Sequence, residues 1–237
     1  MAQTTSTPMH GLPGIELRET CVHVPPDAPL PPLPARECTR HHEAACGATL
    51  VLSIVVGLVG FTHGVALRAG RLPPGAWWAF LVAIYAEAAV ALGCLGGLLL
   101  GDAGEVTRSD PAATAPRPAE VDARLRDGRP LDDLRNPEEP GTGRTYCVRC
   151  FVWRPPRGAS GAPHHCRVCQ RCVLHFDHHC GVYGRCIAGD GVRNGNLRYF
   201  FTIIVMGYAG FFTMLATCVA GLAFRWAATA DEAGSGG

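Results

Sequence analysis

The sequence contains no lysine, since all 21 basic residues are arginines, and 20 acidic residues leave a formal net charge of +1. Proteins that bind nucleic acids through phosphate contacts carry a marked excess of positive charge. The near-neutral balance therefore argues against a dedicated nucleic-acid-binding protein. We interpret the absence of lysine, together with abundant alanine, glycine and proline, as the coding bias of a GC-rich genome.

The first ten residues, MAQTTSTPMH, lack the basic n-region and short apolar run of a cleavable signal peptide. The first apolar segment is therefore expected to remain in the protein as an uncleaved anchor. Residues 1–43 are rich in proline, with VPPDAPLPPLP at 24–34. This composition predicts a disordered tail of polyproline type.

Three segments have almost no charged residues. Segments 47–67 and 199–224 contain none, and segment 76–100 contains only Glu87. A helix needs about 20 apolar residues to cross a membrane, and all three segments are long enough. They predict an α-helical polytopic membrane protein, in which 44–101 forms a transmembrane hairpin and 199–224 a third transmembrane helix.

Glu87 lies inside the second of these spans. A charged carboxyl at the centre of a bilayer costs ~3 kcal/mol, which the surrounding apolar residues can offset. Two interpretations stay open: a carboxyl that faces another helix, and a functional group.

The polar part between the second and third spans divides in two. Residues 102–144 mix Ala, Pro, Arg, Asp and Glu, and predict a flexible linker with a short helix near 121–126. Residues 145–198 hold most of the cysteines, and 225–237 form a polar C-terminal stub. Fifteen arginines lie in 101–198, so the positive-inside bias places this loop and the N-terminal tail in the cytosol.

Seven of the 12 cysteines lie within forty residues, in repeated Cys-x2-Cys pairs beside histidines. They are Cys147, Cys150, Cys166, Cys169, Cys172, Cys180 and Cys186. This is zinc-ligand spacing. A disulfide framework is the alternative, but it fits an oxidising compartment better than a cytosolic loop, and seven is an odd number. Two tetrahedral sites of three cysteines and one histidine each leave one cysteine over.

The stretches YCVRC, RPPR and HHCRVCQRCVLHFDHHC, over 145–186, resemble the cysteine-rich domain of the DHHC protein S-acyltransferases, or palmitoyltransferases. Asp177-His178-His179-Cys180 is similar to the motif that names this family. The two spans before the domain and the one after it agree with the family's layout. The resemblance implies short zinc-stabilised β-hairpins and loops on the cytosolic side of the membrane.

The resemblance also implies two structural Zn²⁺ ions, one bound by each of two ligand sets. The first set would be Cys147, Cys150, His165 and Cys172, with His164 as a possible substitute for His165. The second set would be Cys166, Cys169, His179 and Cys186. Cys180 would be the nucleophile, which takes an acyl group from a fatty acyl-CoA, such as palmitoyl-CoA, and passes it to a cysteine of a substrate protein.

The chemistry needs this residue order. Residues two apart in an extended segment point the same way, so His178 can act as the base for Cys180 while His179 points away toward a metal. Asp177 would orient and stabilise His178, as the acid of a catalytic triad does. Strict alternation aims Asp177 at the wrong face, so the chain must bend there. The alternative interpretation is a solvated Asp–His pair beside a zinc site.

The acyl donor needs its own contacts. Its tail would lie among the membrane helices, and arginines would bind the CoA phosphates. The candidates are Arg154, Arg157, Arg167 and Arg171. A basic surface that faces anionic lipid is the alternative role for them. The expected partners are the bilayer and cytosolic or membrane-associated proteins with juxtamembrane cysteines. The expected locations are the ER, the Golgi or the plasma membrane.

The sequence departs from the family in several places. Gly181-Val182 replaces the usual Pro-Trp, and Arg185 replaces an asparagine, while Asn196-x3-Phe200 matches the family's Asn-x3-Phe. The family normally has four or more spans and a Thr-Thr-x-Glu segment, and three spans without that segment are found here. Two further functional hypotheses are therefore a non-catalytic zinc-binding membrane adaptor and a metal sensor with labile zinc.

Overall fold

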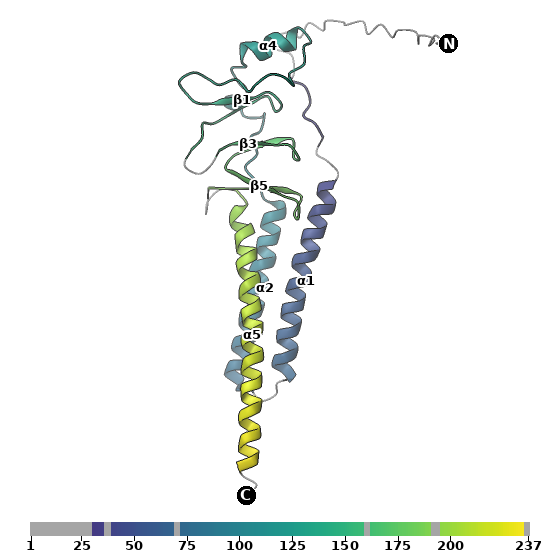
Figure 1. The fold of residues 1–237 in the computed structure, drawn as a ribbon, viewed down its shortest axis with the longest axis vertical. Coiled ribbons are helices and arrows are strands. Elements are labelled where there is room, and N and C mark those ends of the chain that lie inside the picture. Colours follow the sequence, from purple (N-terminus) through teal and green to yellow (C-terminus); the bar gives the residue numbers. More distant parts are fainter. Residues whose placement is uncertain (1–29, 36–38, 69–71, 159–161, 191–194, 235–237) are drawn as a thin grey trace, which may run out of the picture.

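The structure is a computed structural model that describes residues 30–35, 39–68, 72–158, 162–190 and 195–234. Three long helices stand side by side, and a stack of short hairpins covers one end of them (Figure 1). The hairpin that contains β5 lies next to the helices, and the one that contains β1 lies farthest away. The expected fold class is confirmed.

The helices are α1 (Thr39–Arg68), α2 (Pro74–Leu100) and α5 (Leu197–Gly234). Each is long and apolar enough to cross a membrane. Their exposed surface is rich in large apolar side chains, such as Val56, Val82 and Phe212, which suits contact with lipid rather than water. α1 begins before the expected span, and α5 continues through most of the predicted C-terminal stub. The expected spans covered only the apolar residues, whereas the helical conformation continues into the polar residues beside them.

Glu87 faces another helix, as one of the two interpretations has it. Thr213 Oγ1 on α5 donates a hydrogen bond of 2.8 Å to Glu87 Oε1 on α2. This pairing gives one oxygen of the carboxyl a partner inside the apolar bundle and joins α2 to α5.

Six short strands form three separate antiparallel hairpins. β1 (Thr145–Cys147) pairs with β2 (Val152–Arg154), and β3 (His164–Cys166) pairs with β4 (Arg171–Val173). β5 (Phe176–Cys180) pairs with β6 (Arg185–Ala188). A two-stranded hairpin is marginally stable alone, so something other than strand pairing must hold this stack together.

The composition of 102–144 predicts a flexible linker with a short helix near 121–126, and the structure has two short helices in this segment. They are α3 (Pro111–Thr114) and α4 (Ala119–Arg126). Val121 of α4 is fully buried against Tyr146 and Trp153 of the first hairpin, and Trp153 Nε1 donates a hydrogen bond of 2.7 Å to Pro116 O. The few large apolar residues of the segment pack on the aromatic side chains of a hairpin that lies later in the sequence.

The Pro-rich tail is described only over 30–35, and its first 29 residues lie outside the described part of the chain. Within 30–35, Leu33 packs beside the cluster of Cys147, Cys150 and Cys172. Arg171 Nη1 donates a hydrogen bond of 3.1 Å to Pro34 O. The end of the tail is therefore docked on the hairpins.

The junction between β6 and α5 depends on Asn196, which is fully buried. Its Oδ1 accepts a hydrogen bond of 3.0 Å from Ala188 N, and its Nδ2 donates one of 2.9 Å to Cys186 O. Gly195 precedes it with a φ of 79°, and a Cβ at Gly195 would lie 2.1 Å from Ala188 O. Only glycine fits there, and the amide of Asn196 binds the third hairpin to the start of α5.

We expect Asn196→Ala to destabilise this junction by about 2–4 kcal/mol, because it leaves two buried backbone groups without partners. The midpoint of thermal unfolding in detergent should fall by several degrees. Ser109→Ala, which removes an exposed hydroxyl, is the control. An unchanged midpoint in Asn196→Ala would contradict this role of the amide.

Candidate functional site

Two groups of three cysteines and one histidine come together in the hairpin stack, and in each group the four ligand atoms lie within 4.8 Å of one another. The first group is Cys147, Cys150, His165 and Cys172. The second is Cys166, Cys169, His179 and Cys186. These are the two sets that the family resemblance implies. His164 lies outside the first group and stacks on Phe176.

In both groups the histidine presents Nδ1 to the sulfurs. His165 Nδ1 lies 3.2 Å from Cys150 Sγ and 3.6 Å from Cys147 Sγ. His179 Nδ1 lies 3.4 Å from Cys169 Sγ and 3.6 Å from Cys166 Sγ. Four buried or half-buried N and S donors around one point are the donor set of a closed, structural zinc site.

The four ligands of each group come from two successive hairpins. Each group takes two cysteines from the turn of one hairpin and a histidine–cysteine pair that faces across the strands of the next. The cross-strand pairs are His165 with Cys172 and His179 with Cys186. Phe151 and Gln170 directly follow the two Cys-x2-Cys turns, and both have positive φ. Each metal group therefore ties one hairpin to the next.

The sulfurs of each group can ionise together only beside a cation. The hydrogen bond with Cys147 and burial raise the pKa of Cys150 to about 12. The hydrogen bond with Cys169 and burial raise the pKa of Cys186 above its ordinary value. Several thiolates cannot coexist so closely without positive charge, and a divalent ion supplies it. The donor sets therefore fit metal ions.

Cys180 belongs to neither group. It is buried at the end of β5 in a cluster with Val51 of α1, Leu98 of α2 and Ile203 of α5. The neighbouring His179 points the other way, into the second metal group. Because adjacent residues of a strand face opposite sides, one strand directs a histidine to the metal and a thiol to the helices.

The bend that alternation requires at Asp177 is present. The β5–β6 register shifts between Phe176 and His178, which leaves Asp177 as an extra, bulged residue. Asp177 Oδ2 accepts a hydrogen bond of 2.8 Å from His178 Nδ1. The His178 ring also packs edge-on against Phe200 of α5, with 5.4 Å between ring centroids. A carboxylate and an aromatic ring together fix the orientation of the imidazole.

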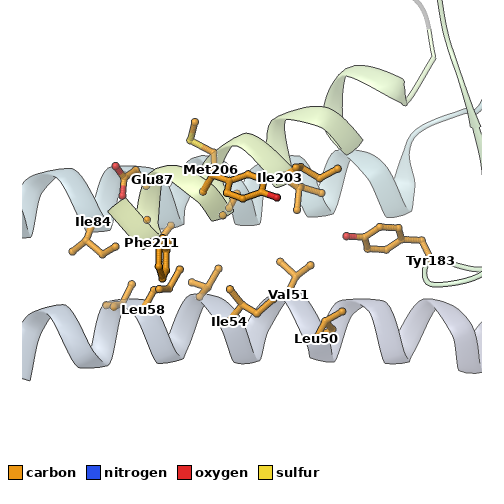
Figure 2. Close-up of a pocket in the computed structure, with 18 residues that line it drawn as sticks. Leu50, Val51, Ile54, Leu58, Ile84, Glu87, Tyr183, Ile203, Met206 and Phe211 are labelled. Atoms are coloured by element: carbon orange, nitrogen blue, oxygen red, sulfur yellow. The ribbon is translucent and has the colours of Figure 1, made fainter. Parts of the chain in front are cut away.

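A cavity of about 510 Å³ lies among α1, α2 and α5. Figure 2 shows Tyr183 at one end and Glu87 at the other, with Ile203 and Met206 between them. Val51, Tyr183 and Ile203 belong to the buried cluster of Cys180 and also line the cavity. Burial and, to a smaller extent, Cys180 raise the pKa of Tyr183, so its phenol stays neutral. The apolar space therefore begins beside the free cysteine.

The candidate arginines are placed unequally. Arg154 and Arg167 line a hollow of about 380 Å³ together with Arg135 and Arg149. Arg171 Nη1 donates hydrogen bonds to Pro34 O and Gln170 O. Arg154 belongs to the hairpin farthest from the helices (Figure 1), and Arg157 is exposed at the end of that hairpin.

Arg185, where the family has asparagine, has a structural role that its sequence position did not indicate. Its guanidinium donates hydrogen bonds to Leu99 O and Gly101 O at the C-terminal end of α2. Cations are favoured at this end of a helix, where carbonyl groups lack partners. Arg185 therefore fastens the third hairpin to α2, next to the metal ligand Cys186.

Comparison with known proteins agrees with this geometry. Residues 141–233 match the family model described as DHHC palmitoyltransferase. Probable protein S-acyltransferase 16 of Arabidopsis thaliana is 32% identical over 112 residues, which cover 44% of this chain and 36% of that relative. Probable protein S-acyltransferase 13 of the same plant is 28% identical over 172 residues, covering 68% and 52%. Palmitoyltransferase ZDHHC9 of Bos taurus is 43% identical over 60 residues, covering 25% and 14%.

The part of the chain that holds the hairpins and α5 is similar to the DHHC palmitoyltransferase family. The chain is a multi-pass integral membrane protein. It spans from about a sixth to about half of the length of the relatives that it matches first. No solved structure matches it.

We expect two metal ions per chain, one for each ligand group. Cys172→Ser should lose the ion of the first group and Cys186→Ser that of the second, because each removes one of four ligands. Cys180→Ser should keep both ions. Elemental analysis of the purified protein measures these contents, and a loss of metal in Cys180→Ser would place that sulfur in a coordination sphere.

Proposed function

We propose that this protein is a membrane-bound protein S-acyltransferase that uses a long-chain fatty acyl-CoA, such as palmitoyl-CoA, as its donor. The observation that carries the proposal is the position of Cys180. It is the cysteine of the DHHC motif, it belongs to neither ligand group, and it shares a buried cluster with residues that line an apolar cavity. The two ions are Zn²⁺ with a structural role, since neither group has an open coordination position.

The reaction has two steps. The sulfur of Cys180 attacks the thioester carbonyl of the acyl-CoA, its proton passes to His178 Nε2, and the CoA thiolate leaves and takes that proton. The thiol of a substrate cysteine then attacks the acyl-Cys180 thioester, and its proton restores the Cys180 thiol through the same imidazole. Each step exchanges one thioester for another, so no oxidant or reductant is needed.

His178 and Asp177 have separate roles. The Nδ1–H of His178 is held by Asp177 Oδ2 at 2.8 Å, which leaves Nε2 available to accept a proton. His178 and Cys180 lie two residues apart on one strand and so share a face. The carboxylate favours the imidazolium that forms when the thiol ionises, as in catalytic triads. Thiolate formation is what makes the sulfur nucleophilic.

The cavity suits the acyl tail. Its lining is almost entirely aliphatic or aromatic and comes from all three helices (Figure 2). Cys180 lies where the third hairpin meets the ends of these helices, so a thioester there has its tail directed into the bundle. Burial of apolar surface at ~25 cal/mol per Å² makes a long chain the favoured occupant.

The CoA part would lie outside the bundle, on the cytosolic side with the hairpins. Arg167 and Arg171 of the middle hairpin, and Arg154 and Arg157 of the first hairpin, stay our candidates for its phosphates. The substrates would be cytosolic or membrane-associated proteins with cysteines near the bilayer, because Cys180 is at the level of the helix ends. The compartment would be the ER, the Golgi or the plasma membrane.

A second function is favoured by one departure from the family. Val182, where tryptophan is usual, is 47% exposed and offers no aromatic ring to the membrane interface. A protein that keeps the zinc fold without turnover, a membrane adaptor, is the resulting alternative. The labelling experiment below separates it from the enzyme.

Purified protein incubated with a clickable palmitoyl-CoA should become labelled on Cys180. Cys180→Ser should remove the label. His178→Ala should slow labelling by about 10²–10⁴-fold, because the general base is lost, and Asp177→Asn should slow it less. Cys46→Ser, at an exposed cysteine of α1, is the control. Labelling that survives Cys180→Ser, or none in a wild-type protein that holds two ions, would reject the enzyme.

Gly207→Phe tests the cavity. Gly207 lines it, and apart from the backbone of its own helix and its chain neighbours no atom lies within 4 Å of where its Cβ would be, so the ring has room to replace the acyl chain. The preference for palmitoyl-CoA over octanoyl-CoA should fall by ~tenfold. Gly93→Phe on α2 has similar space outside the cavity and should leave the preference unchanged. Equal preferences in the two variants would exclude this cavity as the acyl site.

A further inference from the structure

Two buried polar atoms face each other where α1 meets the second metal group. His179 Nε2 and Glu43 Oε2 lie 4.0 Å apart, and their side chains are 14% and 35% exposed. Neither atom has a hydrogen-bond partner in the described part of the chain. A buried polar atom without a partner costs about 1–3 kcal/mol. The two atoms can satisfy each other with a small movement of either side chain.

Their chemistry is complementary. His179 presents Nδ1 to Cys166, Cys169 and Cys186. When Nδ1 binds a metal, the neutral ring carries its proton on Nε2, which can then only donate. A carboxylate oxygen can only accept. Histidines that bind metals usually donate their second N–H to such an oxygen, which fixes the tautomer and the ring orientation.

We propose that Glu43 is a positioning residue that accepts the Nε2–H of His179 and holds this ligand on the second metal ion. The pairing also fastens the beginning of α1 to the strand that ends in Cys180. The inference rests on the metal-binding part of the proposed function, and not on acyl transfer.

Further contacts of α1 support this placement. Glu43, Gly47 and Val51 are four residues apart and so lie on one face of the helix. A Cβ at Gly47 would lie 2.4 Å from Val182 O, so the helix backbone touches the loop after Cys180. Val51 packs in the cluster of Cys180. Three successive turns of α1 therefore contact the third hairpin. Among the three residues on this face of the helix, Glu43 is the polar one.

The first metal group has a different environment. Nε2 of its histidine, His165, is also buried without a hydrogen-bond partner among the described residues, but no contact with a carboxylate like that of His179 with Glu43 is found for it in this part of the chain. The two metal ions should therefore be held unequally. The ion bound by His179 should leave more slowly than the one bound by His165.

The rate of zinc release tests this in the full chain, loaded with two ions and mixed with excess chelator. The wild type should release its ions in two phases, which single-ion Cys172→Ser and Cys186→Ser proteins assign. Glu43→Gln should accelerate release from the His179 group by about 10–100-fold and leave the His165 phase unchanged. In the cobalt-loaded Cys172→Ser protein, adding Glu43→Gln should shift the visible absorption bands of the remaining ion. Glu120→Gln, at an exposed carboxylate of α4, is the matched control.

Several outcomes would overturn the inference. One is equal acceleration of both phases, which indicates general loosening of the domain, and another is no change in either phase. If Glu43→Gln does not yield protein with two ions, Glu43→Asp should give the same one-sided acceleration, and its absence would also reject the pairing. Failure of acyl transfer is a separate result, because a protein that never becomes labelled on Cys180 can still show release that depends on Glu43.

Discussion

Two groups of three cysteines and one histidine, each able to hold a metal ion, are the constraint on which the rest of this structure depends. Three hairpins of two short strands each have too little pairing to stand alone. Each metal group takes its Cys-x2-Cys pair from one hairpin and its cross-strand histidine–cysteine pair from the next. The hairpins are thus joined in series, and the last one meets the membrane helices. The position of Cys180, at the end of that last hairpin, depends on both links.

The five residues of β5, which ends in Cys180, direct side chains to three different places. His179 turns toward the metal, Cys180 turns toward the helices, and a bulge brings Asp177 to His178. Helix residues complete the arrangement, because Phe200 packs on the imidazole and Val51 packs with the thiol. A site of this kind belongs neither to the hairpins nor to the helices, since each supplies groups that the other orients.

The sequence predicted the parts that have a local signal. Runs of apolar residues predicted the three long helices, and cysteine spacing predicted the two groups of donors that the structure brings together. The family resemblance, rather than spacing, indicated which residues share a group. Contacts between distant segments gave no such signal. Arg185 reaches the end of α2, 86 residues earlier, and Glu43 meets His179 across more than a hundred residues. The composition of 102–144 predicted a flexible linker because the segment has few large apolar residues. Those few, such as Val121, pack on the first hairpin, which lies later in the sequence.

The docked end of the Pro-rich tail has a consequence for the order in which the chain folds. Arg171 binds Pro34 across 137 residues of sequence. During synthesis, residues 30–35 are complete long before β4 exists, so nothing is yet present to receive them. Contacts of such long range form late, because loop closure must come first. Residues 30–35 are therefore made before α1 and α2 but reach their place only after β4 has formed.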